Sequence, residues 1–148
     1  MKDERIFTRD FTLDMMISLC CSLNYFTLLI NITGFAAFRF GSDTAIGGTT
    51  AGIYVIGGLL SRIVAGKYIE MVGRKKMLLI GLSFALVMST TYFFVSSIAM
   101  LMAIRFLHGM SYGISSTCTS DIVAKLLPQS RRGEGLGYFF LSITIACA

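Results

Sequence analysis

The sequence predicts an all-α membrane protein, because it is strongly apolar and its charges separate long apolar runs. Hydrophobic residues form 55% of the 148-residue chain and charged residues 14%, with a mean hydropathy of +0.74. An ordinary soluble domain of this size needs much less apolar surface. The 15 glycines and single proline fit membrane helices, in which glycine allows close helix contacts, better than a loop-rich β fold.

Charge and cysteine content narrow the classes of function. A net charge of +5 would suggest nucleic-acid binding in a soluble protein, but here the basic residues lie between apolar runs and not on one face. We therefore expect a lipid bilayer as partner and no nucleic acid. Because Cys20, Cys21, Cys118 and Cys147 lack the CxxC spacing of metal or redox sites, we expect free thiols, no metal and no cofactor.

Five apolar segments are candidate membrane spans, which need about 20 apolar helical residues. Segment 12–38 follows a charged tail. It is longer than the apolar core of a signal peptide and lacks a convincing small-residue cleavage site, so we interpret it as a span. Segment 44–68 contains Gly48 and Gly52, a small-xxx-small pair that predicts close contact with another helix.

The remaining segments are a predicted hairpin and a short final run. Segment 77–95 contains no charged residue, and segment 99–124 follows after an uncharged turn at Ser96 and Ser97. Segment 135–148 is too short to finish a crossing. We therefore expect one domain, 1–148, with four complete spans and an incomplete fifth at which the sequence is cut off.

Lysine and arginine gather in alternate connections, which predicts the orientation of the spans. The basic connections contain Lys2, Arg5 and Arg9; Lys67, Arg74, Lys75 and Lys76; and Lys125, Arg131 and Arg132. Of the other connections, the first carries only Arg39 and the second no basic residue. Because basic loops stay in the cytoplasm, we expect a multi-pass protein of the cell membrane with a cytoplasmic N-terminus.

The connection between the second and third spans has an informative pattern. Gly66 would let the second helix approach a neighbour, Gly73 permits a sharp turn, and Glu70 and Arg74 can pair across that turn. A basic cytoplasmic loop of any membrane protein explains these residues equally well.

This segment resembles the loop motif G-x-L-x-D-R-x-G-R-R/K between the second and third helices of the major facilitator superfamily. Gly66, Gly73, Arg74 and Lys75 match, whereas Glu70 replaces the usual aspartate and Met71 the usual arginine. In that family the loop acts as a conformational latch against a second helical bundle. An acid at the end of the fourth helix often joins it, so the resemblance predicts a cluster of Glu70, Arg74 and Asp121.

Arg105 lies inside the fourth apolar segment, where an arginine costs about 2.5 to 3.5 kcal/mol at mid-helix. It therefore faces the bundle interior or a wet cavity, or it snorkels to the nearby headgroups. Arg105, His108 and Gly109 resemble the family's R-x-x-Q-G motif, with histidine in place of glutamine. The resemblance implies proton coupling by Arg105. His108 suits either a proton shuttle or a hydrogen-bonded packing role.

Several other residues are candidates for structure or function. Asn24 and Asn31 line a pathway or join helices by hydrogen bonds, and Gly109 and Gly113 are candidate packing residues. Asp14 falls at the end of a span, where a carboxylate stays near the interface and solvated. Arg62 shares a helix face with Glu70 and is expected to pair with an acid.

The resemblance implies part of the N-terminal six-helix bundle of a secondary transporter. We expect proton-coupled efflux of small drugs or metabolites by alternating access, with the missing C-terminal helices required for transport. A sugar or metabolite uptake symporter of the same superfamily and a truncated fragment without independent transport activity are the alternatives. No catalytic arrangement surrounds the single histidine, so we expect no enzyme.

Overall fold

The computed structural model of the chain describes residues 6–147. Lys2 and Arg5, which contribute to the predicted orientation, lie outside the described residues, as does Ala148 of the last predicted segment. The elements are α1 (Arg9–Phe40), α2 (Thr44–Val72), α3 (Arg74–Thr91), η1 (Tyr92–Phe94), α4 (Ile98–Leu126), η2 (Gln129–Arg131) and α5 (Arg132–Cys147). The prediction of an all-α fold is confirmed for these residues.

Four stretches are long and apolar enough to cross a membrane: Arg9–Phe40, Thr44–Val72, Arg74–Phe94 and Ile98–Leu126. The prediction of four complete spans is therefore confirmed. Most of the helices extend a few residues beyond the predicted apolar segments, because the helical hydrogen bonds continue into polar residues that suit the membrane surface. Large apolar side chains such as Ile63 and Phe93 are exposed on the outside of the bundle, as lipid contact requires.

Local signals in the sequence set the helix ends. The Thr8 hydroxyl accepts from Phe11 N at 3.3 Å and caps α1, whose other end is closed by Gly41 at φ 61°. Asp43 caps α2 and Ser97 caps α4, each through a side-chain oxygen that accepts a backbone N–H. These caps satisfy N–H groups that helix starts leave unpaired. They explain why the short connections form where the apolar runs end.

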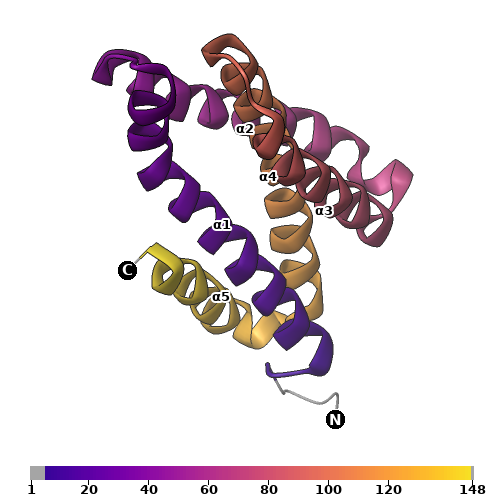
Figure 1. The fold of residues 1–148 in the computed structure, drawn as a ribbon. Helices are drawn as coiled ribbons and strands as arrows, with labels where there is room; N and C mark the ends of the chain where they lie inside the picture. The colour runs from indigo at the N-terminus through magenta and orange to yellow at the C-terminus, as the bar shows by residue number, and fades with distance from the viewer. Residues whose placement is uncertain (1–5, 148) are drawn as a thin grey trace.

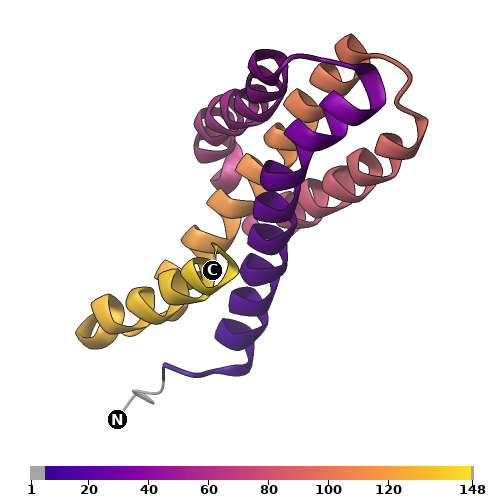
Figure 2. The same cartoon turned by 60° about the vertical axis from the view of Figure 1, so that its left-hand side comes forward.

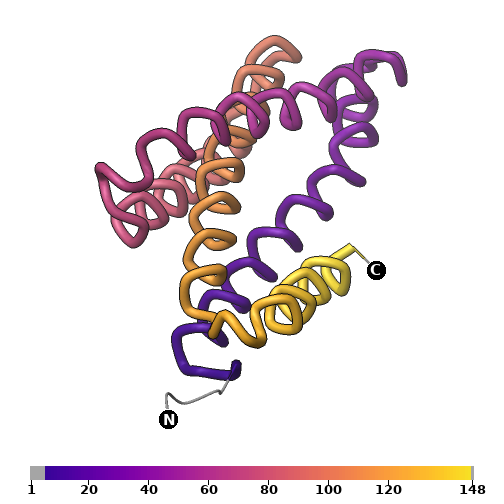
Figure 3. The backbone as a smooth tube through the Cα atoms, turned by 180° about the vertical axis from the view of Figure 1, so that it is seen from behind, coloured from indigo at the N-terminus to yellow at the C-terminus, as the bar shows by residue number. Residues whose placement is uncertain are grey.

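Helix α4 is the centre of the bundle and contacts each of the other four α-helices (Figure 1). Helices α2 and α3 pack on one side of it, while α5 turns back from the end of α4 and runs beside α1 (Figure 2). The α1–α2 and α3–α4 connections lie at one end, and the start of α1 and the α4–α5 connection lie at the other (Figure 3).

Three clusters of buried apolar side chains hold this arrangement together. The first lies where the beginning of α1 meets α4 and α5, the second at the opposite end, and the third between α2, α3 and α4. Their buried members are Ile6, Phe11, Val123, Leu127 and Phe139; Ile32, Ala36, Val95, Leu101 and Ile104; and Ala65, Ile69, Met77, Leu78 and Cys118.

Glycines bring α2 and α4 into backbone contact. A Cβ atom at Gly109 would overlap the carbonyl oxygen of Tyr54, and one at Gly57 would overlap the carbonyl oxygen of Phe106. A Cβ atom at Gly113 would overlap both the Ser61 hydroxyl and the carbonyl oxygen of Gly58. Each helix therefore presents bare backbone to the other, as small residues permit in membrane bundles.

The predicted contact through Gly48 and Gly52 is wrong for the described chain. Both glycines are exposed, and no atom lies within 4 Å of a Cβ built at either position. The buried stripe of α2 runs instead through Gly47, Thr50, Tyr54, Gly57, Gly58, Ser61, Ala65 and Ile69. Gly48 and Gly52 fall beside this stripe because the helical repeat rotates them away from α4.

The alternation of the connections makes the orientation testable by cysteine labelling. In a variant whose four cysteines are replaced by serine, we expect Lys75→Cys and Arg131→Cys to react with an impermeant maleimide only from the cytoplasmic side. We expect Ser96→Cys to react only from outside. Labelling of intact and permeabilised cells measures this, and the opposite accessibility would overturn the orientation.

Candidate functional site

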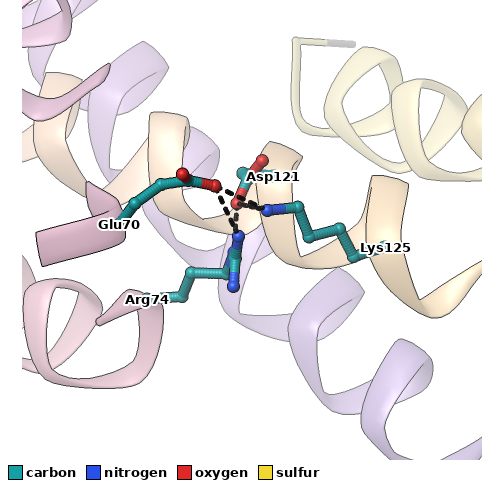
Figure 4. Close-up of polar contacts among 4 residues, drawn as sticks. All are labelled: Glu70, Arg74, Asp121 and Lys125. Atoms are coloured by element: carbon teal, nitrogen blue, oxygen red, sulfur yellow. Dashed lines mark hydrogen bonds and ion pairs between the residues drawn. The ribbon is translucent and has the colours of Figure 1, made fainter. Parts of the chain in front are cut away.

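Four charged side chains join three helices where α2 meets α3 (Figure 4). Arg74 Nε donates to Asp121 Oδ2 in a close ion pair, and Arg74 Nη2 donates to Glu70 Oε1 at 3.2 Å. Lys125 Nζ donates to the same Glu70 oxygen at 3.3 Å and lies 3.6 Å from Asp121 Oδ2. We call Glu70, Arg74, Asp121 and Lys125 the charge cluster; it contains two cations and two anions.

Gly73 positions the charge cluster. It separates α2 from α3 with φ 90° and ψ 135°, and its N–H donates to Ile69 O at 3.1 Å. A positive φ strongly favours glycine, so the sharp turn depends on this residue. The turn starts α3 at Arg74, whose side chain then reaches both Glu70 and Asp121.

The side chains of the charge cluster are partly exposed to solvent. The side chains of Arg74 and Asp121 are 33% and 32% exposed, and that of Glu70 is 75% exposed. Ion pairs at such positions are weak, because water screens the charges and the side chains lose conformational freedom when they pair. A contact of this strength forms and breaks readily, as a switch between two conformations requires.

The structure brings Glu70, Arg74 and Asp121 together, as the resemblance to the family's loop motif predicts. Lys125 was missed as a partner, although its i, i+4 spacing from Asp121 on one helix is a usable signal. Gly66 does not make the expected helix contact, because a Cβ there would meet open space. Lys75 is exposed, and within the described residues it forms no ion pair.

Arg105 lies inside the bundle. It is 0% exposed, its Nε donates to Thr50 O at 3.3 Å, and its guanidinium carbon lies 4.5 Å from the centroid of the Tyr54 ring. Within residues 6–147, Nη1 and Nη2 have no hydrogen-bond partner. Snorkelling is therefore wrong for the described chain, because the side chain points into the α2–α4 interface and not toward a surface.

The glycine contact explains how Arg105 reaches α2. Gly109 lies one turn after Arg105 and meets the backbone at Tyr54, which brings α2 close enough for the Thr50 carbonyl to accept from the arginine. A cation packed on an aromatic ring in a dry site gains about 2 kcal/mol. This offsets part of the cost of burying a charge whose other donors stay unpaired.

His108 is 2% exposed and lies on the same helix as Arg105. Its Nδ1 is 3.3 Å from the Tyr92 hydroxyl, and its ring meets the Tyr54 ring edge-on at a centroid distance of 5.5 Å. His108 thus has the hydrogen-bonded environment of a packing residue. It also lines a cavity of about 310 Å³ between the helices, together with Asn24.

The two asparagines of α1 have different surroundings. Asn24 is exposed at the wall of that cavity. Asn31 is also exposed, and its Nδ2 donates to Thr27 O of its own helix at 2.7 Å. Of the two, Asn24 alone has the placement expected for a residue that lines a pathway.

Two further charges depart from expectation. Asp14 is buried, at 4% exposure, and its Oδ2 has no hydrogen-bond partner in the described part of the chain, so the predicted solvated position is wrong. Arg62 is exposed and forms no ion pair with any acid between residues 6 and 147. It lines a small cavity beside Tyr25, Tyr54 and Tyr112, a grouping that sequence spacing gave no signal to find.

Comparison with known proteins gives consistent results. The sequence matches the family model described as Major Facilitator Superfamily over residues 15–148. It is 31% identical over 109 residues to a Mycobacterium tuberculosis protein named as an uncharacterized MFS-type transporter. That similarity covers 74% of this chain and 18% of the relative, so the chain spans less than a fifth of the relative's length. No solved structure matches the chain.

Proposed function

This chain belongs to the major facilitator superfamily, and we propose that it forms part of a secondary transporter that exports small drugs or metabolites in exchange for protons. Membership points to a multi-pass membrane protein that transports rather than catalyses. The proposal includes export as the direction of transport and protons as the coupling ion. It also includes a place in the cell membrane with a cytoplasmic N-terminus, and a second helical bundle against which these helices would rock.

The observation that carries the proposal is the buried Arg105. A guanidinium inside a membrane bundle with two donors unpaired is costly, so such residues mark ion or substrate pathways. Arg105, with His108 beside it on the same buried helix face, therefore suits a role in coupling transport to an ion.

The charge cluster supports alternating access. Its ion pairs tie the ends of α2 and α3 to α4, and each pair is weak enough to open. A cluster that forms in one conformation and separates in the other would bias the two states by its summed interaction energy. This is how Glu70, Arg74 and Asp121 would gate transport.

Proton exchange tests the proposed function. In respiring inside-out vesicles that contain the protein, adding an exported drug should dissipate the pH gradient, because protons leave as the drug enters. Recovery of quenched acridine fluorescence measures this for a panel of small drugs and metabolites. Movement of protons and substrate in the same direction would indicate an uptake symporter, and no flux with any compound would indicate a fragment without transport activity.

Exchanging the charges tests the gating role. We expect Arg74→Gln to change the exchange rate only about two- to fivefold, since exposed ion pairs contribute little to the balance of conformations. The double variant Arg74→Asp with Asp121→Arg should recover part of the wild-type rate, and the control Lys76→Gln should leave the rate unchanged. A wild-type exchange rate in Arg74→Gln would show that the charge cluster does not gate transport.

A further inference from the structure

Three tyrosines from three helices meet at one point in the bundle. Tyr25 of α1 stacks on Tyr112 of α4 with ring centroids 5.1 Å apart and planes 15° apart. Tyr54 of α2 completes the group, at 5.3 Å from Tyr25 and 6.0 Å from Tyr112. We call these residues the tyrosine cluster. Aromatic rings at such distances attract one another in addition to the gain from their burial, so the surface they form is preorganised.

The tyrosine cluster forms one wall of a cavity of about 150 Å³, which Gly58, Leu59 and Arg62 also line. A cavity of about that volume holds one benzene molecule when its walls are apolar. The space therefore fits a single aromatic ring. Its lining supplies aromatic and aliphatic surface and one charged group.

The charge around the cavity is positive. Arg62 is the one charged residue in its lining, and it forms no ion pair or hydrogen bond within the described chain. The second charge close by is Arg105, which lies against the Tyr54 ring. Two nearby cations would repel a cationic ligand, and no acid in the lining would offset this repulsion. Arg105 also already occupies the cation–π position on the Tyr54 ring. An anion is favoured instead.

We propose that this cavity binds a small aromatic carboxylate, with its ring against the tyrosine cluster and its carboxylate on Arg62. The guanidinium of Arg62 matches a carboxylate through two parallel N–H···O hydrogen bonds, which adds directionality to the charge attraction. The binding site stands on the cavity and its charges alone. That the bound anion is also the transported substrate rests on the proposed function.

Equilibrium binding of radiolabelled benzoate to the purified protein in lipid nanodiscs tests the proposal. We expect saturable binding that unlabelled benzoate displaces. Acetate lacks the ring, benzyl alcohol lacks the charge, and phenyltrimethylammonium has the opposite charge, so each should compete at least about tenfold more weakly. This order is measured on the unaltered protein, and equal competition by any of the three, or no benzoate binding, would overturn the proposal.

Variants locate the binding groups. Arg62→Gln should weaken benzoate binding about tenfold or more, and Arg62→Lys less, because lysine keeps the charge without the two parallel hydrogen bonds. Tyr112→Leu should weaken binding, whereas Tyr112→Phe, which keeps the ring, should not. Arg39→Gln, at an exposed arginine of α1, is the matched control. Unchanged affinity in Arg62→Gln would mean that Arg62 serves the lipid surface and not the ligand.

The binding and transport results separate the two proposals. Benzoate binding without any proton-coupled flux would leave the aromatic carboxylate site standing and count against the proposed transporter. Proton exchange with other compounds, in a protein that does not bind benzoate, would support the transporter and overturn the site.

Discussion

Replacing Gly109 with alanine should prevent α2 and α4 from packing and destabilise the protein by about 3 kcal/mol. The added methyl group would overlap the Tyr54 carbonyl oxygen, and a backbone atom cannot rotate away as a side chain can. This destabilisation is opposite to what helix propensity predicts, because alanine stabilises a helix by about 1 kcal/mol relative to glycine. Thermal unfolding in detergent and the yield of monodisperse protein measure the effect.

Gly52→Ala is the matched control. It adds the same methyl group to the partner helix, at a position where no atom lies within 4 Å of the new carbon. This variant should unfold at the wild-type temperature or slightly above it. A wild-type midpoint for Gly109→Ala would show that the two backbones are farther apart than the structure describes.

Arg105→Ala should sharply reduce proton-coupled exchange while the protein still inserts into the membrane. The change removes a buried charge that contacts Thr50 O and the Tyr54 ring. A hydrogen bond to a charged group contributes about 1.5 to 3 kcal/mol, so we expect a loss of coupled flux of about 10- to 150-fold. Drug-driven proton release from vesicles measures coupling, and exchange of labelled for unlabelled substrate without a gradient measures binding and movement alone.

Two variants separate coupling from structure. Arg105→Lys keeps the positive charge and should retain part of the coupled flux, while Arg39→Ala removes an exposed arginine of α1 and should retain all of it. We expect Arg105→Ala to lose gradient-driven flux more than exchange without a gradient. Normal coupling in Arg105→Ala would assign the arginine a packing role only.

Apolar run length and loop charge were sufficient to predict the four spans, since bilayer thickness dictates both. Glu70 and Arg74 were predictable for a similar reason, because they lie close together in the chain across one glycine turn. Asp121 needed the resemblance to a known family, as it is far from both in sequence.

The remaining features depend on how the helices rotate against one another, which a pattern within one helix does not specify. Gly48 and Gly52 satisfy the small-xxx-small spacing as well as any pair, yet the contact face of α2 runs through Gly57 and Gly58. The burial of Asp14 and the meeting of three tyrosines from three helices likewise follow from the packing. The placement of Arg105 away from lipid has the same origin.

The backbone contact between α2 and α4 has a mechanical consequence. Helices that meet through long side chains slide past each other when those side chains change rotamer. At Gly57 and Gly109 the facing atoms are all backbone, so we expect the pair to resist shear and to move as one unit. We therefore expect a rearrangement of this domain to bend at Gly73 or to shift α1 and α5 around α2 and α4, with these two helices as its fixed frame.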